Sequence, residues 1–308
     1  MNIEQKIINE LLKAKQVLCI CHLDPDGDTI WSAIALKELL RQKKVKVKVA
    51  CGDPVPENLK IFPGVDKVST KIHEGWSNGL VVALEAGDVK RLGFSIKVDI
   101  NIDHHFDNTK YGKINWIDAK ASALASMIYK MSRSAKFKIT PVIASLLYAA
   151  ISSDTGGFRF GNTTRQTFAD ANELVRCGAQ PDKIYHLVYE NVSARALQKL
   201  GQALKELKVI EKGKIVYSAV KKVDAETGHG IIDVIRTIRG TEIAILFKEL
   251  GAKRVKVSLR SKNNFNVQAV AKKFNGGGHK KAAGCELNLS LAEAKNKVLK
   301  EITKRLRD

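Results

Sequence analysis

The chain has 308 residues, of which 44% are hydrophobic and 27% are charged. This composition is ordinary for one large or two medium globular domains with a sizeable core. No apolar stretch approaches the length that crosses a bilayer, and residues 1–15 lack the features of a signal peptide, so we expect a cytoplasmic protein with no membrane partner. The five cysteines are odd in number and scattered, which favours buried free thiols over disulfides.

The net charge of +20 is unevenly distributed along the chain. Residues 1–190 carry a net charge of +5, whereas residues 191–308 hold 26 Lys and Arg against 11 Asp and Glu, a net charge of +15. The second part of the chain therefore favours polyanionic partners and speeds their encounter. Charge alone does not separate this role from solubility or from the lysine enrichment of heat-adapted proteins.

An acidic cluster follows the first predicted β-strand. The apolar run 17–21 predicts a buried strand, and residues 29–43 have helical spacing. Between them lie His22, Asp24, Asp26 and Asp28. Carboxylates this close repel each other unless cations neutralise them, and with a histidine they form a set suited to Mn²⁺, Mg²⁺ or Zn²⁺. The alternative is an Asp-rich turn in which Asp28 caps the following helix.

Three further acidic or histidine clusters stand at or just after the ends of predicted elements in the first 190 residues. The strands predicted at 80–85 and 96–102 end in Glu85 and in the string Asp103-His104-His105. An apolar helix predicted at 141–152 precedes Asp154.

Other elements complete the first part of the chain. Helices are predicted at 3–15 and 164–177, and a basic edge strand at 44–50. Strands that alternate with helices predict a mostly parallel sheet with helices on both faces. Because parallel strands end at one edge of a sheet, the acidic and histidine clusters can converge there.

The remaining residues predict a second, smaller domain. Residues 191–208 have the pattern of a long polar helix, which we interpret as a linker. Three strands and three helices follow, at 214–220, 242–250, 254–259, 231–238, 267–274 and 291–306. We therefore expect an α/β protein with domains at 1–190 and 209–308 and a cleft between them.

The four clusters together fit a two-metal hydrolase. Two neighbouring ions need about ten ligand positions, and one bridging carboxylate can serve both ions. Asp103 is well placed to hold an imidazole in one tautomer. A Ser-His-Asp triad is disfavoured because no G-x-S-x-G motif is present.

The motifs resemble those of the DHH phosphoesterase superfamily, in particular its short DHH–DHHA1 members. The likeness covers nearly the whole chain and rests on motifs in the family's order: His22-Leu-Asp24-Pro-Asp26-Gly-Asp28, Asn101-Ile-Asp103-His104-His105, Asp154-Thr-Gly-Gly, Ser258-Leu-Arg260-Ser261-Lys262 and Gly276-Gly-Gly-His279. The resemblance implies cleavage of short oligoribonucleotides or pApA to 5′-mononucleotides and of pAp to AMP and phosphate. The partners implied are short RNA, dinucleotides and nucleoside bisphosphates, and a homodimer stays open.

The resemblance also implies residue roles. Two ions, expected as Mn²⁺ with Mg²⁺ or Co²⁺ as alternatives, would be held by six side chains: His22, Asp26, Asp28, Glu85, His104 and Asp154. His105 would contact the scissile phosphate and protonate the leaving oxygen, supported by Asp103. The implied substrate-binding residues of the second domain are Arg260, Ser261, Gly276, Gly277, Gly278 and His279.

The glycine run 276–278 also carries a physical argument. Successive glycines let backbone N–H groups approach an anion closely, and Arg260 and His279 add charge beside them. The alternative is a flexible turn between a helix and a strand. The guanidinium of Arg260, a good fork for phosphate, favours phosphate or base binding.

Two departures from the family pattern leave a second function open. Glu85 stands where the family has an aspartate, so its longer side chain changes the spacing of the ions, and Asp88 is a candidate replacement. Residues 123–126 read Ala-Leu-Ala-Ser, so a polar side chain that usually supports the helix after the third motif is lost. The alternative is a catalytically weak nucleotide-binding or sensor protein. An inorganic pyrophosphatase and a long-strand exonuclease are disfavoured, by the second-domain motifs and by the length of the chain.

Overall fold

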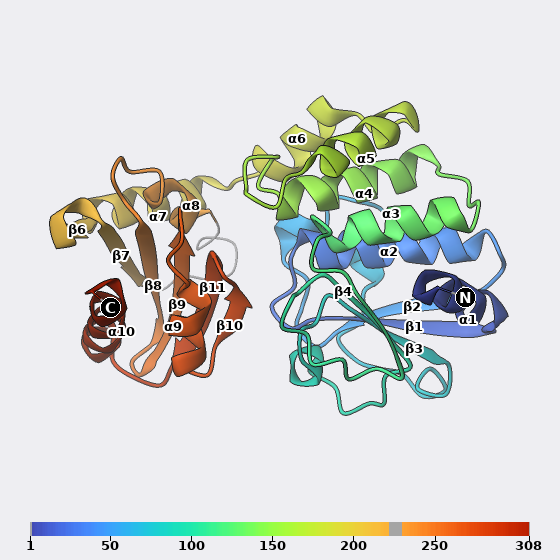
Figure 1. The fold of residues 1–308 in the computed structure, drawn as a ribbon, viewed down its shortest axis with the longest axis horizontal. Coiled ribbons are helices and arrows are strands. Elements are labelled where there is room, and N and C mark those ends of the chain that lie inside the picture. The colour runs from blue at the N-terminus through green and yellow to red at the C-terminus, as the bar shows by residue number, and fades with distance from the viewer. Residues whose placement is uncertain (1, 222–229, 308) are drawn as a thin grey trace. The chain divides into compact units, whose positions relative to one another are not determined.

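The computed structural model describes residues 2–221 and 230–307 (Figure 1). The chain divides after Asn191 into two compact units, each with its own sheet and its own buried apolar residues. The predicted fold class, an α/β protein with a parallel-sheet domain and a smaller mixed domain, is confirmed. Among the described residues, no helix is both long enough and apolar enough to cross a membrane.

Neighbouring strands of the first sheet are all parallel. In spatial order they are β2 (Lys46–Cys51), β1 (Gln16–Cys21), β3 (Leu80–Leu84), β4 (Ile100–Asp103) and β5 (Ile114–Ile117), of which β5 was not predicted. The register pairs Cys21 with Leu84 and Leu84 with Ile102. The residues that follow β1, β3 and β4 therefore lie at one edge of the sheet.

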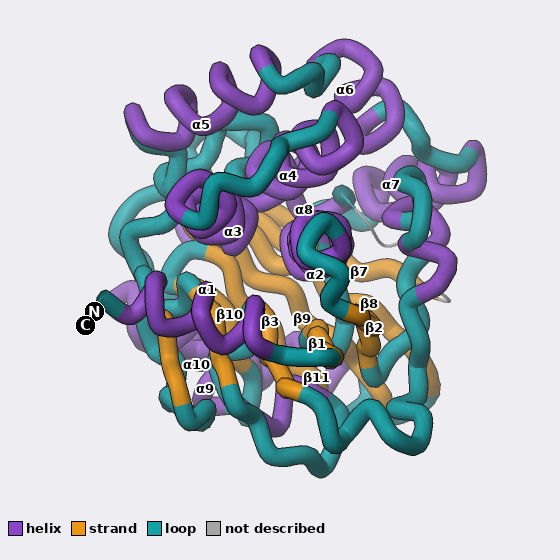
Figure 2. Tube along the Cα trace, turned by 90° about the vertical axis from the view of Figure 1, so that its right-hand side faces the viewer, coloured by secondary structure: helices purple, strands orange, loops and turns teal. Residues whose placement is uncertain are grey.

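One face of this sheet is covered by helices. The helices of the first unit are α1 (Ile3–Lys13), α2 (Gly27–Arg41), α3 (Leu124–Ser134), α4 (Pro141–Asp154), α5 (Arg165–Arg176) and α6 (Pro181–Tyr189). Apolar residues of α1 to α4 form one buried cluster with one face of the strands. Figure 2 shows α2, α3 and α4 together on that side of β1 and β3.

The opposite face is covered by loops. Leu18 and Ile20 of β1 pack there against Leu92 and Phe94, which lie in the connection between β3 and β4. The prediction of helices on both faces is therefore wrong for this unit. Glycine and proline interrupt the connections after β2 and β3 before an apolar helical stripe can form, and only three short 3₁₀ helices appear there: η1 (Glu57–Leu59), η2 (Val65–Lys67) and η3 (Val89–Leu92).

The second sheet is mixed and has helices on both faces. Its spatial order is β10 (Gly277–His279), β11 (Ala282–Leu287), β9 (Arg254–Ser261), β8 (Ile243–Gly251), β7 (Ile215–Lys221) and β6 (Lys208–Ile210). Only β7 and β8 are parallel among these described pairs. Helices α9 (Val267–Lys273) and α10 (Leu291–Arg307) pack on one face, and α7 (Ala194–Lys205) and α8 (Ile231–Ile235) on the other.

Helix α7 lies within the range predicted as a linker, and it packs on the second sheet. Ala203 is fully buried, and its carbonyl accepts a hydrogen bond of 2.6 Å from the hydroxyl of Ser218 on β7. The rest of α7 is largely exposed, including Leu197 and Leu204.

The glycine run is a strand and not the loop that the sequence predicted. Gly277 and Gly278 pair with Gly284 and Ala283 in an antiparallel hairpin. A Cβ atom on Gly276 would lie 2.2 Å from the carbonyl oxygen of Gly284, and one on Gly278 would lie 2.5 Å from that of Ala282. Gly278 also has a φ of +124°. Gly276 and Gly278 are therefore required by the close approach of two strands, whereas a Cβ on Gly277 would have open space.

Candidate metal centre

Side chains from four segments meet at the carboxyl edge of the first sheet. They form two groups in which the potential ligand atoms all lie within 4.8 Å of one another. The first group is His22, Asp26 and Glu85, and the second is Asp28, His104 and Asp154. The structure thus brings together all six side chains that the sequence predicted as metal ligands.

Glu85 lies between the two groups. Its Oε1 is 3.6 Å from Nε2 of His104, and that nitrogen is 3.9 Å from Oδ2 of Asp154. In the first group, Nε2 of His22 is 3.8 Å from Oδ2 of Asp26. These separations are too long for hydrogen bonds, as expected for donor atoms that surround an ion. A carboxylate in the position of Glu85 can contact one ion in each group.

The residues present fit divalent cations. Oε2 of Glu85 is buried and has no hydrogen-bond partner among the residues that the structure describes. Burial first, and then the charge of Asp26, raises the pKa of Glu85 well above its usual range. Burial and then Asp154 raise the pKa of Asp28 to about 8. Bound cations would stabilise these carboxylates in the charged form, and oxygen and imidazole donors suit Mn²⁺ or Mg²⁺.

Glu85 also has an uncommon backbone conformation. It follows β3 directly with a φ of +55°, in the left-handed region. Its backbone N–H still donates to the carbonyl of Ile102, 3.0 Å away, so the residue stays tied to β4. A non-glycine residue held in this region at a strand end is a frequent sign of a functional site.

Asp28 is held by a helix that begins 96 residues later. Its carboxylate accepts hydrogen bonds from the backbone N–H groups of Leu124 at 2.6 Å and Ala125 at 3.0 Å. Ala123, the N-cap residue of α3, provides no side-chain cap, so Asp28 supplies it. The alternative that Asp28 caps its own helix is wrong, because Asp26 accepts from the N–H of Thr29 and caps α2.

Asp154 is positioned by Asn162, which sequence reasoning missed. Nδ2 of Asn162 lies 3.0 Å from Oδ2 of Asp154, 3.1 Å from its carbonyl oxygen and 2.9 Å from the carbonyl oxygen of Ser122. The end of α4 packs closely on the first turn of α2, since a Cβ on Gly27 would lie 2.8 Å from Oγ of Ser153. This packing places Asp154 near α2. Asn162 is eight residues after Asp154, beyond a glycine turn, and no local pattern marks it.

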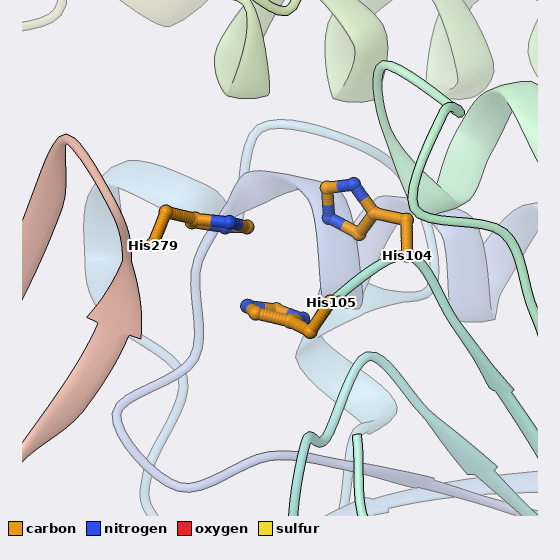
Figure 3. A group of neighbouring side chains, drawn as sticks. All are labelled: His104, His105 and His279. Atoms are coloured by element: carbon orange, nitrogen blue, oxygen red, sulfur yellow. The ribbon is translucent and has the colours of Figure 1, made fainter. Parts of the chain in front are cut away.

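The imidazole rings of His104 and His105 lie next to each other (Figure 3). Their ring centroids are 5.1 Å apart with an interplanar angle of 63°. Nδ1 of His104 lies 3.3 Å from the carbonyl of Ala121, which only accepts, so this nitrogen carries the proton and Nε2 faces Glu85 and Asp154. Burial alone would lower the pKa of His104, but the charges of Asp154 and Asp28 raise it overall.

His105 is held by Asp103. Nδ1 of His105 lies 2.7 Å from Oδ1 of Asp103, which also accepts from the backbone N–H of His105 at 3.1 Å. Asn108 donates to the other oxygen of Asp103 at 2.5 Å. Burial alone would raise the pKa of Asp103, but the hydrogen bonds from His105 and Asn108 lower it overall. An ionised Asp103 fixes the proton of His105 on Nδ1 and directs Nε2 away from the carboxylate.

Arg91 adds a positive charge beside His22. Nδ1 of His22 lies 2.8 Å from the carbonyl of Leu23, and one guanidinium nitrogen of Arg91 lies 3.2 Å from both groups. Since the carbonyl only accepts, Nδ1 of His22 and Arg91 both donate to it, and Nε2 of His22 faces Asp26.

The substrate-binding residues predicted for the second unit lie on three adjacent strands. Arg260 of β9 pairs with Ala282 of β11, which pairs with His279 of β10. Ser261 is buried, and its hydroxyl donates to the carbonyl of Phe265 at 2.7 Å. The strand register therefore brings Arg260 close to the glycine hairpin. The hydroxyl of Ser261, in contrast, already donates a hydrogen bond within the second unit.

Comparison with known proteins identifies the family. Residues 16–151 match the DHH family, N-terminal domain, and residues 212–308 match the DHHA1 domain. The Streptococcus mutans protein named "Probable bifunctional oligoribonuclease and PAP phosphatase NrnA" is 32% identical over 311 residues, which cover 94% of each chain. The chain belongs to the DHH–DHHA1 phosphoesterase family.

A further relative and a solved structure also resemble this DHH–DHHA1 protein. The bifunctional oligoribonuclease and PAP phosphatase NrnA of Thermus thermophilus is 29% identical over 313 residues, 98% of this chain and 94% of that one. The crystal structure of an exopolyphosphatase-related protein from Bacteroides fragilis has a TM-score of 0.88 at 23% identity, covering 98% and 96% of the two chains, which shows a shared fold. The family implies divalent metal, and the two side-chain groups of this DHH–DHHA1 protein agree with it.

Proposed function

We propose that this DHH–DHHA1 phosphoesterase hydrolyses short oligoribonucleotides and pApA to 5′-mononucleotides, and pAp to AMP and phosphate, with two Mn²⁺ ions in the cytoplasm. The oligoribonuclease and pAp phosphatase activities come from the names of relatives that match over nearly their whole length, and the cleavage of pApA comes from the resemblance of the sequence motifs. The observation that carries the proposal is the position of Glu85, within reach of both side-chain groups. That position supports a metal pair despite the extra methylene relative to aspartate.

The ligands proposed follow the two groups. His22, Asp26 and Glu85 would hold one ion, and Asp28, His104 and Asp154 the other, with Glu85 reaching both. When bound, such a pair lowers the pKa of water and neutralises charge that develops on phosphoryl oxygens. Asn162, and the N-terminus of α3 through Asp28, keep the carboxylates in place.

His105 is proposed to protonate the leaving oxygen. Asp103 accepts from Nδ1 of His105, which holds the ring in one orientation. Charge on Asp103 also stabilises the protonated imidazole, and this makes Nε2 a proton donor toward a substrate. Substrate phosphates are proposed to bind Arg260 and residues Gly276–His279 of the basic second unit, where Arg260 presents a planar fork.

The test is a panel of substrates and metals. Purified protein is incubated with pApA, pAp, cyclic di-AMP and a five-nucleotide RNA, each with Mn²⁺, Mg²⁺, Co²⁺ or EDTA, and products are resolved by chromatography. We expect AMP from pApA and pAp with Mn²⁺, and no product in EDTA. Binding of pApA without turnover under all metals would contradict the proposal and favour the sensor alternative.

Two variants test whether the carboxylate of Glu85 serves both side-chain groups. Glu85→Ala removes the carboxylate that reaches both groups, and turnover of pApA should fall by a factor on the order of 10³. Asp88→Ala, three residues further on, is the matched control, because the carboxylate of Asp88 accepts from the N–H of Lys90 and caps η3. Equal losses in the two variants, or activity retained in folded Glu85→Ala, would remove Glu85 from the ligand set.

A further inference from the structure

Two phenylalanine rings form a stack at the surface of the first unit. Phe158 lies just after α4, and Phe168 lies on α5. Their ring centroids are 5.6 Å apart with an interplanar angle of 23°. The inner ring, that of Phe158, packs against the buried apolar cluster and Tyr148, whereas Phe168 is 58% exposed. Phe158 therefore supports Phe168 from within, and much of the outer ring is open to solvent and can stack on a further planar group.

The backbone of Phe158 adopts an uncommon conformation. Its φ is +63°, in the left-handed region, which a bulky residue seldom occupies because its Cβ crowds the following carbonyl. The N–H of Phe158 donates to Oγ1 of Thr155 at 3.2 Å, so the turn after α4 holds this conformation in place. Residues kept in such a conformation are frequent at binding sites. The position of this ring therefore indicates a role beyond packing.

The turn after α4 joins the stack to the candidate metal centre. Asp154, the last residue of α4, precedes Phe158 by four residues, which span at most about 14 Å. The backbone N–H groups of Arg159 and Phe160 both donate to the carbonyl of Thr155 at 2.9 Å, so the turn is compact. A stacked strand advances about 3.4 Å per nucleotide. A strand with its scissile phosphate at the metal centre would therefore reach Phe158 within about four nucleotides.

Two exposed arginines flank the stack. Arg165 is the first residue of α5, three residues before Phe168, so the two side chains are neighbours on that helix. Arg159 follows Phe158 directly, and its Nε donates to the carbonyl of Gly156 at 2.5 Å. Neither arginine forms an ion pair with a residue that the structure describes. Guanidinium groups that contact phosphates beside rings that stack bases are the usual combination in sites for single-stranded nucleic acid.

A second exposed aromatic residue, on α6, provides a contrast. Tyr185 is 54% exposed, and its ring centroid lies 5.1 Å from that of Tyr189. Asp182, three residues before Tyr185 on α6, places a negative charge where Arg165 places a positive charge beside Phe168. A phosphate backbone is repelled by this carboxylate. Charge therefore selects the stack of Phe158 and Phe168 over the tyrosines as a surface for a polyanionic strand.

We infer that Phe168, supported by Phe158 and flanked by Arg159 and Arg165, stacks a base of an oligoribonucleotide beyond the dinucleotide at the metal centre. The inference rests on the proposed function for the RNA nature of the substrate. It deepens that function, because it adds a binding site on α5 and the turn after α4 that distinguishes longer strands from pApA. Strands of about five nucleotides gain affinity from this site, whereas pApA does not.

The experiment compares the five-nucleotide strand pApApApApA with pApA. Affinities are measured by isothermal titration calorimetry with the full chain in EDTA, so that no turnover occurs. The parent should bind the longer strand about tenfold more tightly than pApA, a gain typical of one base stacked on an aromatic ring. Phe168→Ser should abolish this difference without changing the affinity for pApA. The matched control is Tyr185→Ser, which removes a similarly exposed ring and should keep the difference.

A conservative variant and the dependence on salt give the second test. Phe168→Trp keeps a planar ring, so its affinity for the longer strand should stay within about threefold of the parent. Arg165→Gln should reduce the slope of log Kd against log salt concentration for that strand by about 0.7, since one phosphate contact is lost. The slope for pApA should not change.

Four results would overturn the inference. They are equal affinity of the parent for the two ligands, an unchanged difference in Phe168→Ser, equal weakening of both ligands by that variant, and an unchanged salt slope in Arg165→Gln. An unchanged difference in Phe168→Ser would instead favour a protein partner for the exposed ring. Failure of the proposed function is a separate result, because it would appear as absence of pApA hydrolysis by the parent with Mn²⁺.

Discussion

The two units of this protein build their functional surfaces in different ways. In the first unit, parallel strands end together, so buried acids and histidines from distant segments meet at one edge. In the second unit most neighbouring strands are antiparallel, so strand ends alternate, and Arg260 lies near the end of β9 beside the start of β11. A parallel sheet concentrates ionisable groups away from water, whereas the mixed sheet presents cations at its surface. We therefore expect the first unit to govern the chemical step and the second to govern affinity.

The largest expected effect tests the first half of this comparison. His105→Asn removes the proposed proton donor, and kcat for pApA should fall by about 10²–10⁴-fold while Mn²⁺ stoichiometry stays the same. Steady-state kinetics and metal titration measure the two quantities. His186→Asn, on exposed α6, serves as the control. A kcat within threefold of the parent would place the proton donor elsewhere.

The second half of the comparison predicts a change in KM. Arg260→Gln should raise KM for pApA about tenfold with kcat preserved, because a charge-assisted contact to substrate is lost. Arg254→Gln is the control on the same strand, since Arg254 pairs with Glu286 on the surface. A loss of kcat at saturating substrate with unchanged KM would mean that the second unit takes part in the chemical step.

Metal binding should release protons from the buried acids. At pH 7 the carboxyl of Asp28, with a pKa of about 8, holds a proton in the metal-free protein, and the proton must leave when an ion binds. Since the pKa of Glu85 is raised as well, Mn²⁺ affinity should rise with pH by about tenfold or more per pH unit below pH 8. Calorimetry at pH 7 in two buffers of different ionisation enthalpy measures the protons released. Identical heats in both buffers would show that the buried carboxyl groups are already ionised without metal.

The smallest effect concerns the link between Asp28 and α3. Asp28→Ala and Asp28→Asn both remove the ionisable carboxyl group, but only Asn keeps an oxygen that accepts from Leu124 or Ala125. In urea unfolding without metal, the Ala variant should be less stable than the Asn variant by about 1 kcal/mol. Both variants should lose activity with pApA. Equal stability of the two would show that Asp28 does not cap the helix.

Sequence reasoning named the six side chains of the candidate metal centre from the family resemblance, and each of them lies near the end or the start of a strongly patterned element. Glu85 is an example, since it ends an apolar run and the carboxyl ends of parallel strands share an edge. The partners of those side chains were not predictable. Asn162 and the N–H groups of Leu124 and Ala125 act across turns or long separations, and no periodic pattern records such contacts.

The second unit shows a different limit. The run of glycines at 276–278 predicted a loop, because three flexible residues in a row seldom favour a strand. The structure pairs Gly277 and Gly278 in a hairpin, and a Cβ on Gly276 or Gly278 would collide with the backbone of Gly284 or Ala282. The glycine composition indicated flexibility. The structure shows instead that glycine is needed where the backbones of two strands approach closely.

The loop-covered face of the first sheet affects how local unfolding would disrupt the candidate metal centre. The carbonyl of Ala86 accepts from Asn108 at 3.0 Å and from Tyr111 at 2.9 Å, and Asn108 also holds Asp103. The covering segment and the residues around the candidate metal centre are therefore linked by hydrogen bonds, and we expect them to open together. Partial opening of this face, of the kind that amide hydrogen exchange detects, would dismantle the site while the helical side stays folded.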